Sequence, residues 1–118
     1  MSRDASGDCY EAAAKLILAI TNHGRTDRPD VRLVHAEVAG QGELSGLQFG
    51  HAFVLFDDQR VLDLSNGNAI VMAKDRYYQI GRIDEIGNVI EYTAKEAIAK
   101  INDHEHYGPW DLVTESGL

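Results

Sequence analysis

The only cysteine of the chain, Cys9, stands near the expected start of a helix. Asp8 has N-cap chemistry and Glu11 follows it at the spacing of a capping box, so we expect a helix over residues 8–20 with Cys9 at its first helical position. The free N–H groups and the positive dipole end at that position favour an anion, and the thiolate is the reactive form of cysteine. The position predicts a nucleophile, and the alternative is a small, inert core residue.

A cysteine nucleophile needs a base, and the base needs an orienting partner. His51 opens the apolar segment 51–56, and Asp63 lies inside the next apolar segment, 60–65. A carboxylate within an apolar run is costly unless it is paired or hydrogen-bonded. We therefore expect Asp63 to hold the imidazole of His51. The alternative for each residue taken alone is a structural role: His51 would be a hydrogen-bonded histidine at a sheet edge, and Asp63 would cap a turn.

The length of the connecting loop decides which residue faces His51. A three-residue loop, 56–58, places Asp63 opposite the histidine. A two-residue loop, 58–59, places Asn66 there instead, and an asparagine also orients the histidine in papain-like enzymes. We predict Asp63, with Asn66 as the alternative orienting residue.

Short periodic segments separated by polar turns surround these residues. Segment 31–38 alternates like a strand, and Thr93 with Glu96 opens a second capping box. The order of elements predicts one α+β domain over residues 1–118, in which an N-terminal helix carrying Cys9 packs on an antiparallel sheet and a short helix follows near the C-terminus. We further expect a loop over 41–50, a short strand at 69–72, an aromatic-rich segment at 76–80, a hairpin of 81–84 with 89–92, a last helix ending near residue 101 and an irregular remainder.

The composition narrows the classes of partner. Eleven basic and nineteen acidic residues give a formal charge of −8, which disfavours binding to nucleic acid or to anionic lipid. The longest apolar stretch, 12–20, is interrupted by Lys15 and is too short to cross a bilayer. A single cysteine closes no intrachain disulfide, so we expect a cytoplasmic protein without a membrane partner.

The remaining histidines and aromatic residues are expected to be structural. His35 lies within an expected strand and should be packed. His104 and His106 alternate, but two ligands do not make a metal site, so we expect neither a metal nor another cofactor. Residues 76–78 and Trp110 either fill the core or line a groove for a substrate.

The chain contains the segments Gly7-Asp8-Cys9, His51-Ala52-Phe53-Val54 and Val61-Leu62-Asp63, in this order. Together these three segments resemble the transglutaminase-like branch of the papain-like cysteine hydrolase fold. The resemblance spans roughly residues 7–65 and implies Cys9 as nucleophile, His51 as base and Asp63 as the residue that orients the base. It departs from the usual pattern at Phe53, where a tryptophan is common, and in lacking a glutamine before the cysteine. The chain also resembles small phage and bacterial proteins.

These expectations combine into two hypotheses of different classes. The first is a cysteine hydrolase or acyltransferase, similar to a thiol protease or amidase, that acts on an amide, isopeptide or thioester bond of a peptide or protein through Cys9, His51 and Asp63. Hydrolysis is favoured because no sequence feature indicates a site for a second amine. The alternative is a catalytically silent module of the same fold that binds a protein, for example a viral protein that engages a host factor.

Overall fold

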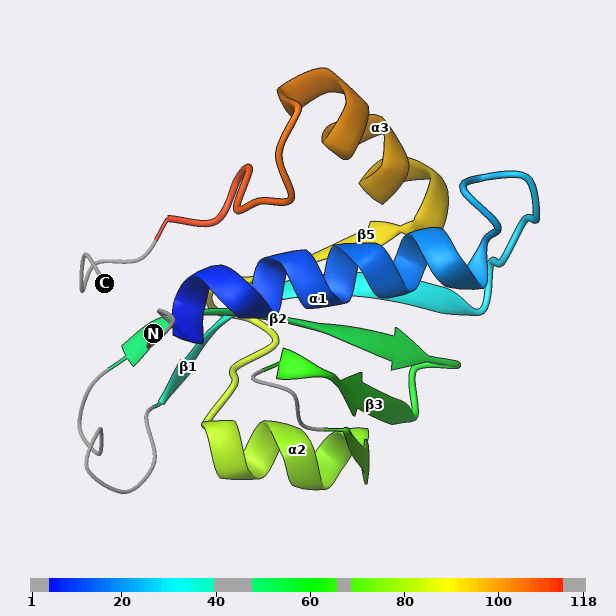
Figure 1. Ribbon diagram of the computed structural model, residues 1–118. Helices are drawn as coiled ribbons and strands as arrows, with labels where there is room; N and C mark the ends of the chain where they lie inside the picture. Colours follow the sequence, from blue (N-terminus) through cyan, green and yellow to red (C-terminus); the bar gives the residue numbers. More distant parts are fainter. Residues whose placement is uncertain (1–4, 40–47, 66–68, 114–118) are drawn as a thin grey trace.

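The computed structural model describes residues 5–39, 48–65 and 69–113 (Figure 1). Asn66, the alternative partner of His51, lies outside the described residues. The helices are α1 (Ala5–Ile20), α2 (Lys74–Gly81) and α3 (Ala94–His104), and the strands are β1 (Val31–Ala39), β2 (Gln48–Phe56), β3 (Arg60–Asp63), β4 (Ile70–Ala73) and β5 (Val89–Thr93).

The strands form one antiparallel sheet with the order β4-β3-β2-β1-β5. Strands β1 to β4 pair with their sequence neighbours, as a meander does, whereas β5 returns to the far edge of β1. The predicted α+β class, with an N-terminal helix that carries Cys9 on an antiparallel sheet and a helix towards the C-terminus, is confirmed. None of the helices in the described ranges is long and apolar enough to cross a membrane.

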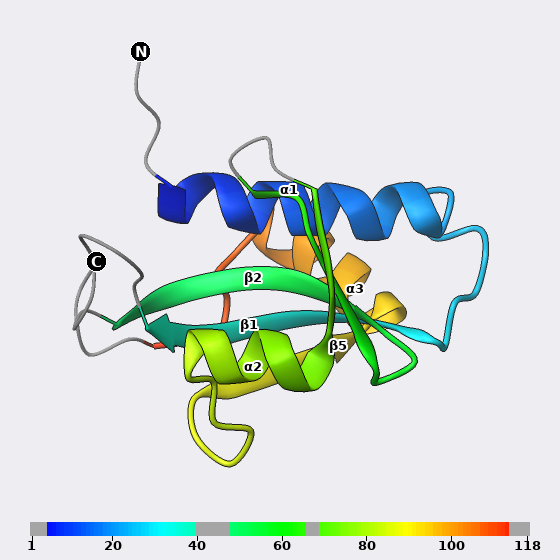
Figure 2. The ribbon, with the colours of Figure 1, turned by 90° about the horizontal axis from the view of Figure 1, so that it is seen from below.

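The helices cover both faces of the sheet, with α1 and α2 on opposite sides (Figure 2). Successive side chains along each strand point to opposite faces of the sheet, so alternate residues pack against the helices on each face. On one face, residues of α1 and α3 pack against Val31, Leu33, Ala52 and Val54. On the other face, Tyr78 of α2 packs in a cluster with inward-facing residues of β1, β2 and β3, namely Val34, Ala36, Val38, Phe53, Leu55 and Val61.

The predicted start of the first helix is wrong by about one turn. Because α1 begins at Ala5, Asp8 is inside the helix and Cys9 is its fifth residue. Glu11 pairs with Lys15, with Oε2 and Nζ 2.7 Å apart, and does not serve the expected capping box. Serine or aspartate at positions 2, 4, 6 and 8 offered several equivalent helix starts, so the local pattern left the choice open.

Two further sequence expectations need correction. The first is the loop over 41–50, because residues 48–50 belong to β2. The aromatic-rich segment 76–80, for which the sequence predicted no helix or strand, lies in α2. The expected hairpin of 81–84 with 89–92 does not form, because β5 pairs with β1. The short separation in sequence favoured the hairpin. Strand β5 pairs instead with the nine-residue strand β1, which lies 50 residues or more away along the chain.

Candidate active site

The candidate nucleophile, Cys9, lies in the second turn of α1 and is fully buried. The first four N–H groups of a helix are those that lack partners within it, and here all of them precede Cys9. The N–H of Cys9 therefore falls within the hydrogen-bonded body of the helix. The prediction that Cys9 stands at the first helical position, where free N–H groups favour an anion, is therefore wrong.

His51, on β2, contacts both of the residues expected around it. Its Nε2 lies 2.9 Å from Oδ2 of Asp63 at the end of β3. A hydrogen bond also joins the His51 ring to the side chain of Cys9. Because Nε2 engages the carboxylate, Nδ1 is the ring nitrogen left for the sulfur. The structure thus brings together three side chains from α1, β2 and β3, separated by up to 54 residues in sequence.

The predicted contact of His51 with Asp63 is present, but it arises from a different strand register. Val54 pairs with Leu62 and Phe56 pairs with Arg60, so the loop has three residues, 57–59, and not 56–58. This register continued along the strands would place Asp63 beside Phe53. A shift of two residues keeps every side chain on its original face of the sheet, so Asp63 still reaches His51 along a diagonal.

Both oxygens of the Asp63 carboxylate also accept hydrogen bonds from residues other than His51. The hydroxyl of Tyr77, on α2, donates to Oδ2 at 2.6 Å. The backbone N–H and the hydroxyl of Ser65 donate to Oδ1 at 2.9 and 2.7 Å. These partners explain how a carboxylate is tolerated in an apolar segment. Sequence reasoning missed both roles, although it had noted the aromatic residues at 76–78.

The electrostatics of the pair follow from these bonds. Burial by itself lowers the pKa of His51, but hydrogen bonds to Asp63 and Cys9 outweigh it and raise the pKa to about 9. Burial raises the pKa of Asp63, and the bonds from His51, Tyr77 and Ser65 reverse that effect and hold it well below its usual range. Burial and the Asp63 charge both raise the pKa of the Tyr77 hydroxyl. The hydrogen bonds therefore favour the protonated form of His51 and the ionised form of Asp63.

The site lies at one edge of β2. Strand β1 pairs along all of β2, whereas β3 pairs only with residues 54–56. By strand alternation His51 shares the α2 side of the sheet with Phe53, while Cys9 belongs to the cluster on the α1 side. Cys9 and His51 therefore come from opposite faces of the sheet, and His51 lies on the part of β2 with which β3 does not pair.

His35 is packed, as predicted, and takes no part in this site. It is fully buried in β1, and its ring centroid lies 4.9 Å from that of Tyr10, 5.2 Å from that of Tyr92 and 5.0 Å from that of Trp110. Neither ring nitrogen has a hydrogen-bond partner among the described residues. Burial lowers the pKa of His35 to about 4, an effect that the charge of Asp111 partly offsets.

The other candidate residues serve packing or remain at the surface. His104 and His106 are exposed, with ring centroids 5.7 Å apart. Over residues 5–39, 48–65 and 69–113 no three potential metal ligands of the His, Cys, Asp and Glu types come together. Trp110 packs against the first hydrophobic cluster, beside His35, and Tyr78 belongs to the second.

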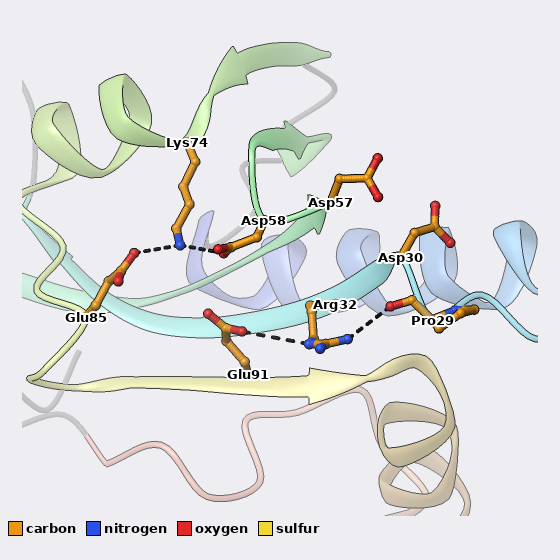
Figure 3. A pocket seen from close by; sticks show the side chains of 8 residues that line it. All are labelled: Pro29, Asp30, Arg32, Asp57, Asp58, Lys74, Glu85 and Glu91. Carbon is orange, nitrogen blue, oxygen red and sulfur yellow. Dashed lines mark hydrogen bonds and ion pairs between the residues drawn. The ribbon is translucent and has the colours of Figure 1, made fainter.

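A separate cavity of about 480 Å³ opens on the α2 side of the sheet (Figure 3). Lys74 reaches across it, with Nζ 2.6 Å from Asp58 and 2.7 Å from Glu85. Arg32 lies 3.9 Å from Glu91. The two Lys74 pairs connect α2 to the β2–β3 turn and to the segment before β5, and the Arg32 pair connects β1 to β5. The residues that line the cavity do not include Cys9, His51 or Asp63. Its full lining is Pro29, Asp30, Arg32, Asp57, Asp58, Lys74, Glu85 and Glu91.

Comparison of the chain with protein-family models, with curated proteins and with solved structures finds no match in any of the three.

Proposed function

We propose that this protein is a cysteine hydrolase or acyltransferase that acts on an amide, isopeptide or thioester bond of a peptide or protein. The observation that supports the proposal is the continuous set of hydrogen bonds from Cys9 to His51 to Asp63. A nucleophile, a base and an orienting carboxylate from three different elements meet in the order that covalent acyl transfer requires.

In the proposed reaction the sulfur of Cys9 attacks the carbonyl carbon of the substrate. His51 accepts the proton of the Cys9 thiol as the C–S bond forms, and it donates this proton to the leaving amine or thiol as the bond to that group breaks. His51 then deprotonates a water that attacks the thioester carbonyl. The C–S bond breaks, the acid product leaves, and His51 returns the proton to the sulfur, which restores the thiol. Asp63 keeps Nε2 of the ring occupied, so that Nδ1 faces the sulfur throughout.

The burial of Cys9 favours a second candidate function. With the sulfur fully buried, an acyl group reaches it only after the surrounding residues move apart. A protein-binding module has no need of that motion, because it depends on its surface and not on one sulfur. In that case the Cys9, His51 and Asp63 set is a buried polar network that stabilises the fold.

The experiment that separates the two candidates is acylation by p-nitrophenyl acetate. The chain has one cysteine, so the acetyl adduct that the parent forms and Cys9→Ser lacks is the one at Cys9. Acetylation of lysine or tyrosine side chains is common to the two proteins and is subtracted by comparing their intact masses. We expect a covalent acetyl adduct that hydrolyses with time. We expect Cys9→Ser to fold with a near-parental melting temperature and to lose this adduct along with the biological activity of the parent. His51→Ala should slow adduct formation by about 10²–10⁴-fold.

The matched control is His104→Ala, which removes an exposed histidine from the end of α3 and should leave acylation unchanged. A parent protein that is not acetylated would exclude catalysis by Cys9 and leave the binding module. The same conclusion would follow if Cys9→Ser kept the full biological activity of the parent.

A further inference from the structure

The outer edge of the sheet at β4 presents a short strand without charged side chains. Its four residues are Ile70, Val71, Met72 and Ala73, and β4 is the last strand on its side of the sheet. Val71 is 63% exposed and Ile70 is 37% exposed. Edge strands with exposed apolar residues and free main-chain groups are templates for pairing with another strand.

One main-chain hydrogen bond shows which groups of β4 face outward. The N–H of Lys74 donates to the C=O of Gln59 at 2.8 Å, and this pair continues the register between β3 and β4. In an antiparallel ladder, residues that exchange hydrogen bonds with the partner alternate with residues whose N–H and C=O point away from it. Counting back from Lys74, Met72 bonds to β3, whereas Val71 and Ala73 point to the open edge.

The pairing of β1 with β2 independently shows which main-chain groups of β4 face the open edge. The N–H of Asp57 donates to the C=O of Asp30 at 2.8 Å, which continues the register between β1 and β2. Alternation carried from this bond through β2 and β3 again turns Val71 and Ala73 outward. Both residues are exposed, so their main-chain groups are accessible.

The other sheet edge, β5, is protected in ways that β4 is not. The N–H of Val89 donates to Gly87 at 3.1 Å, and the N–H of Thr93 donates to Glu96 at 2.9 Å. Between them Glu91 places a charge on the strand. Charged side chains and satisfied N–H groups are the usual means by which sheet edges avoid pairing. Strand β4 has neither a charge nor a proline.

We propose that β4 pairs antiparallel with β4 of a second copy of this chain. A twofold axis at Met72 places Val71 opposite Ala73 of the second copy and Ala73 opposite its Val71, which makes four main-chain hydrogen bonds. The strand suits its own copy because no charge lies on it, so no like charges face each other across the axis despite the net charge of −8. The two sheets become one continuous ten-stranded sheet.

The dimer is weak and depends on salt. Four residues per copy bury far less than the roughly 1,200–2,000 Å² of a stable interface. Two copies that each carry a charge of −8 repel one another, and salt screens this repulsion. Self-association therefore strengthens as ionic strength rises, which is the opposite of the behaviour of a contact held by ion pairs.

Sedimentation equilibrium of the full chain, at protein concentrations up to millimolar and at low and high salt, tests the proposal. We expect a monomer–dimer equilibrium that Val71→Lys weakens by about tenfold or more, because it places two like charges across the axis. Val71→Pro should act similarly, since the N–H it removes faces outward and holds no bond to β3. Ile86→Lys is the matched control, because Ile86 is 96% exposed and lies outside β4, in the segment between α2 and β5.

Amide hydrogen exchange locates the contact. Exchange at Val71 and Ala73 should slow as protein concentration rises in the parent and not in Val71→Lys. A chain that remains monomeric at every concentration and salt overturns the proposal. So does a dimer that survives both Val71 variants, or one that Ile86→Lys weakens equally. Protection of these amides only by an added, uncharged Val-Thr repeat peptide would point to capture of an extended peptide and would also overturn self-pairing.

Discussion

At the scale of single residues, Asp63 is the most connected side chain of the candidate site. Its carboxylate accepts from His51, from Tyr77 and twice from Ser65, so each oxygen has two donors. Hydrogen bonds to a charged group are stronger than bonds between neutral groups, and a buried carboxylate that loses one is only partly compensated. The Tyr77 hydroxyl is therefore a positioning group for the carboxylate that holds His51.

We predict that Tyr77→Phe destabilises the fold by about 2 kcal/mol, because it removes a donor from a buried carboxylate. With one donor fewer, the pKa of Asp63 moves up towards its ordinary range. Urea unfolding measures the first effect, and an NMR titration of the Asp63 carboxyl measures the second.

The neighbouring tyrosine provides the control. Tyr78 is also buried on α2, but its hydroxyl has no hydrogen-bond partner among the described residues. Tyr78→Phe should therefore be neutral or slightly stabilising. Equal losses in the two variants would mean that ring packing, and not the bond to Asp63, determines the effect.

The sequence allowed the three site residues to be predicted, but not the strand register and the hydrogen-bond partners that hold them in place. A cysteine near a helix start, a histidine at the start of an apolar segment and a carboxylate in an apolar run are visible in the sequence. Whether these three side chains come into contact, however, depends on the strand register. The register predicted from the sequence placed the side chains on the correct face of the sheet but was wrong by two residues. Tyr77 could not be assigned, because the position of α2 against β3 depends on packing between distant segments.

At the scale of elements, helix starts differ in how well the sequence defines them. The start of α3 was correctly predicted, because Thr93 and Glu96 make both bonds of a capping box, at 2.9 and 3.1 Å. The start of α1 was not, because several residues fit the same role. Strand β5 was placed correctly and paired wrongly, since residue alternation identifies a strand but not a distant partner.

We predict opposite effects from two cap substitutions. Thr93→Ala should destabilise the protein by about 1 kcal/mol, because it removes the side-chain acceptor for the N–H of Glu96. Ala73, the N-cap of α2, makes no side-chain cap bond, so Ala73→Ser should stabilise by a similar or smaller amount. Thermal unfolding of the two variants against the parent measures both changes. Loss of stability in both would show that N-cap chemistry does not control these helix starts.

At the scale of the whole molecule, two histidines make stability depend on pH in opposite directions. An unfolded histidine titrates near 6.5. The pKa of His35 is lowered to about 4, so between pH 6.5 and 4 the unfolded chain binds the proton first and stability falls as pH falls. The pKa of His51 is raised to about 9, so between pH 6.5 and 9 only the folded chain keeps the proton and stability falls as pH rises.

We predict that the free energy of unfolding is greatest near pH 6.5 and that each histidine changes it by roughly 3 kcal/mol across its own range. Urea unfolding at a series of pH values measures the profile. His35→Phe should flatten the profile between pH 6.5 and 4, and Asp63→Asn should flatten it between pH 6.5 and 9. A profile that the two variants leave unchanged would assign the pH dependence to other groups.

The packing of Trp110 on His35 has an optical consequence. Trp110 is the only tryptophan, its indole N–H donates to the C=O of His106 at 3.0 Å, and its ring lies beside an imidazole that is neutral at ordinary pH. A protonated imidazole quenches indole emission, whereas solvent exposure shifts that emission to longer wavelength. The protein therefore carries an intrinsic fluorophore at the contact between its C-terminal segment and the sheet. Loss of its emission intensity without a change of wavelength indicates protonation of His35 within the fold. A shift to longer wavelength indicates release of the segment into water.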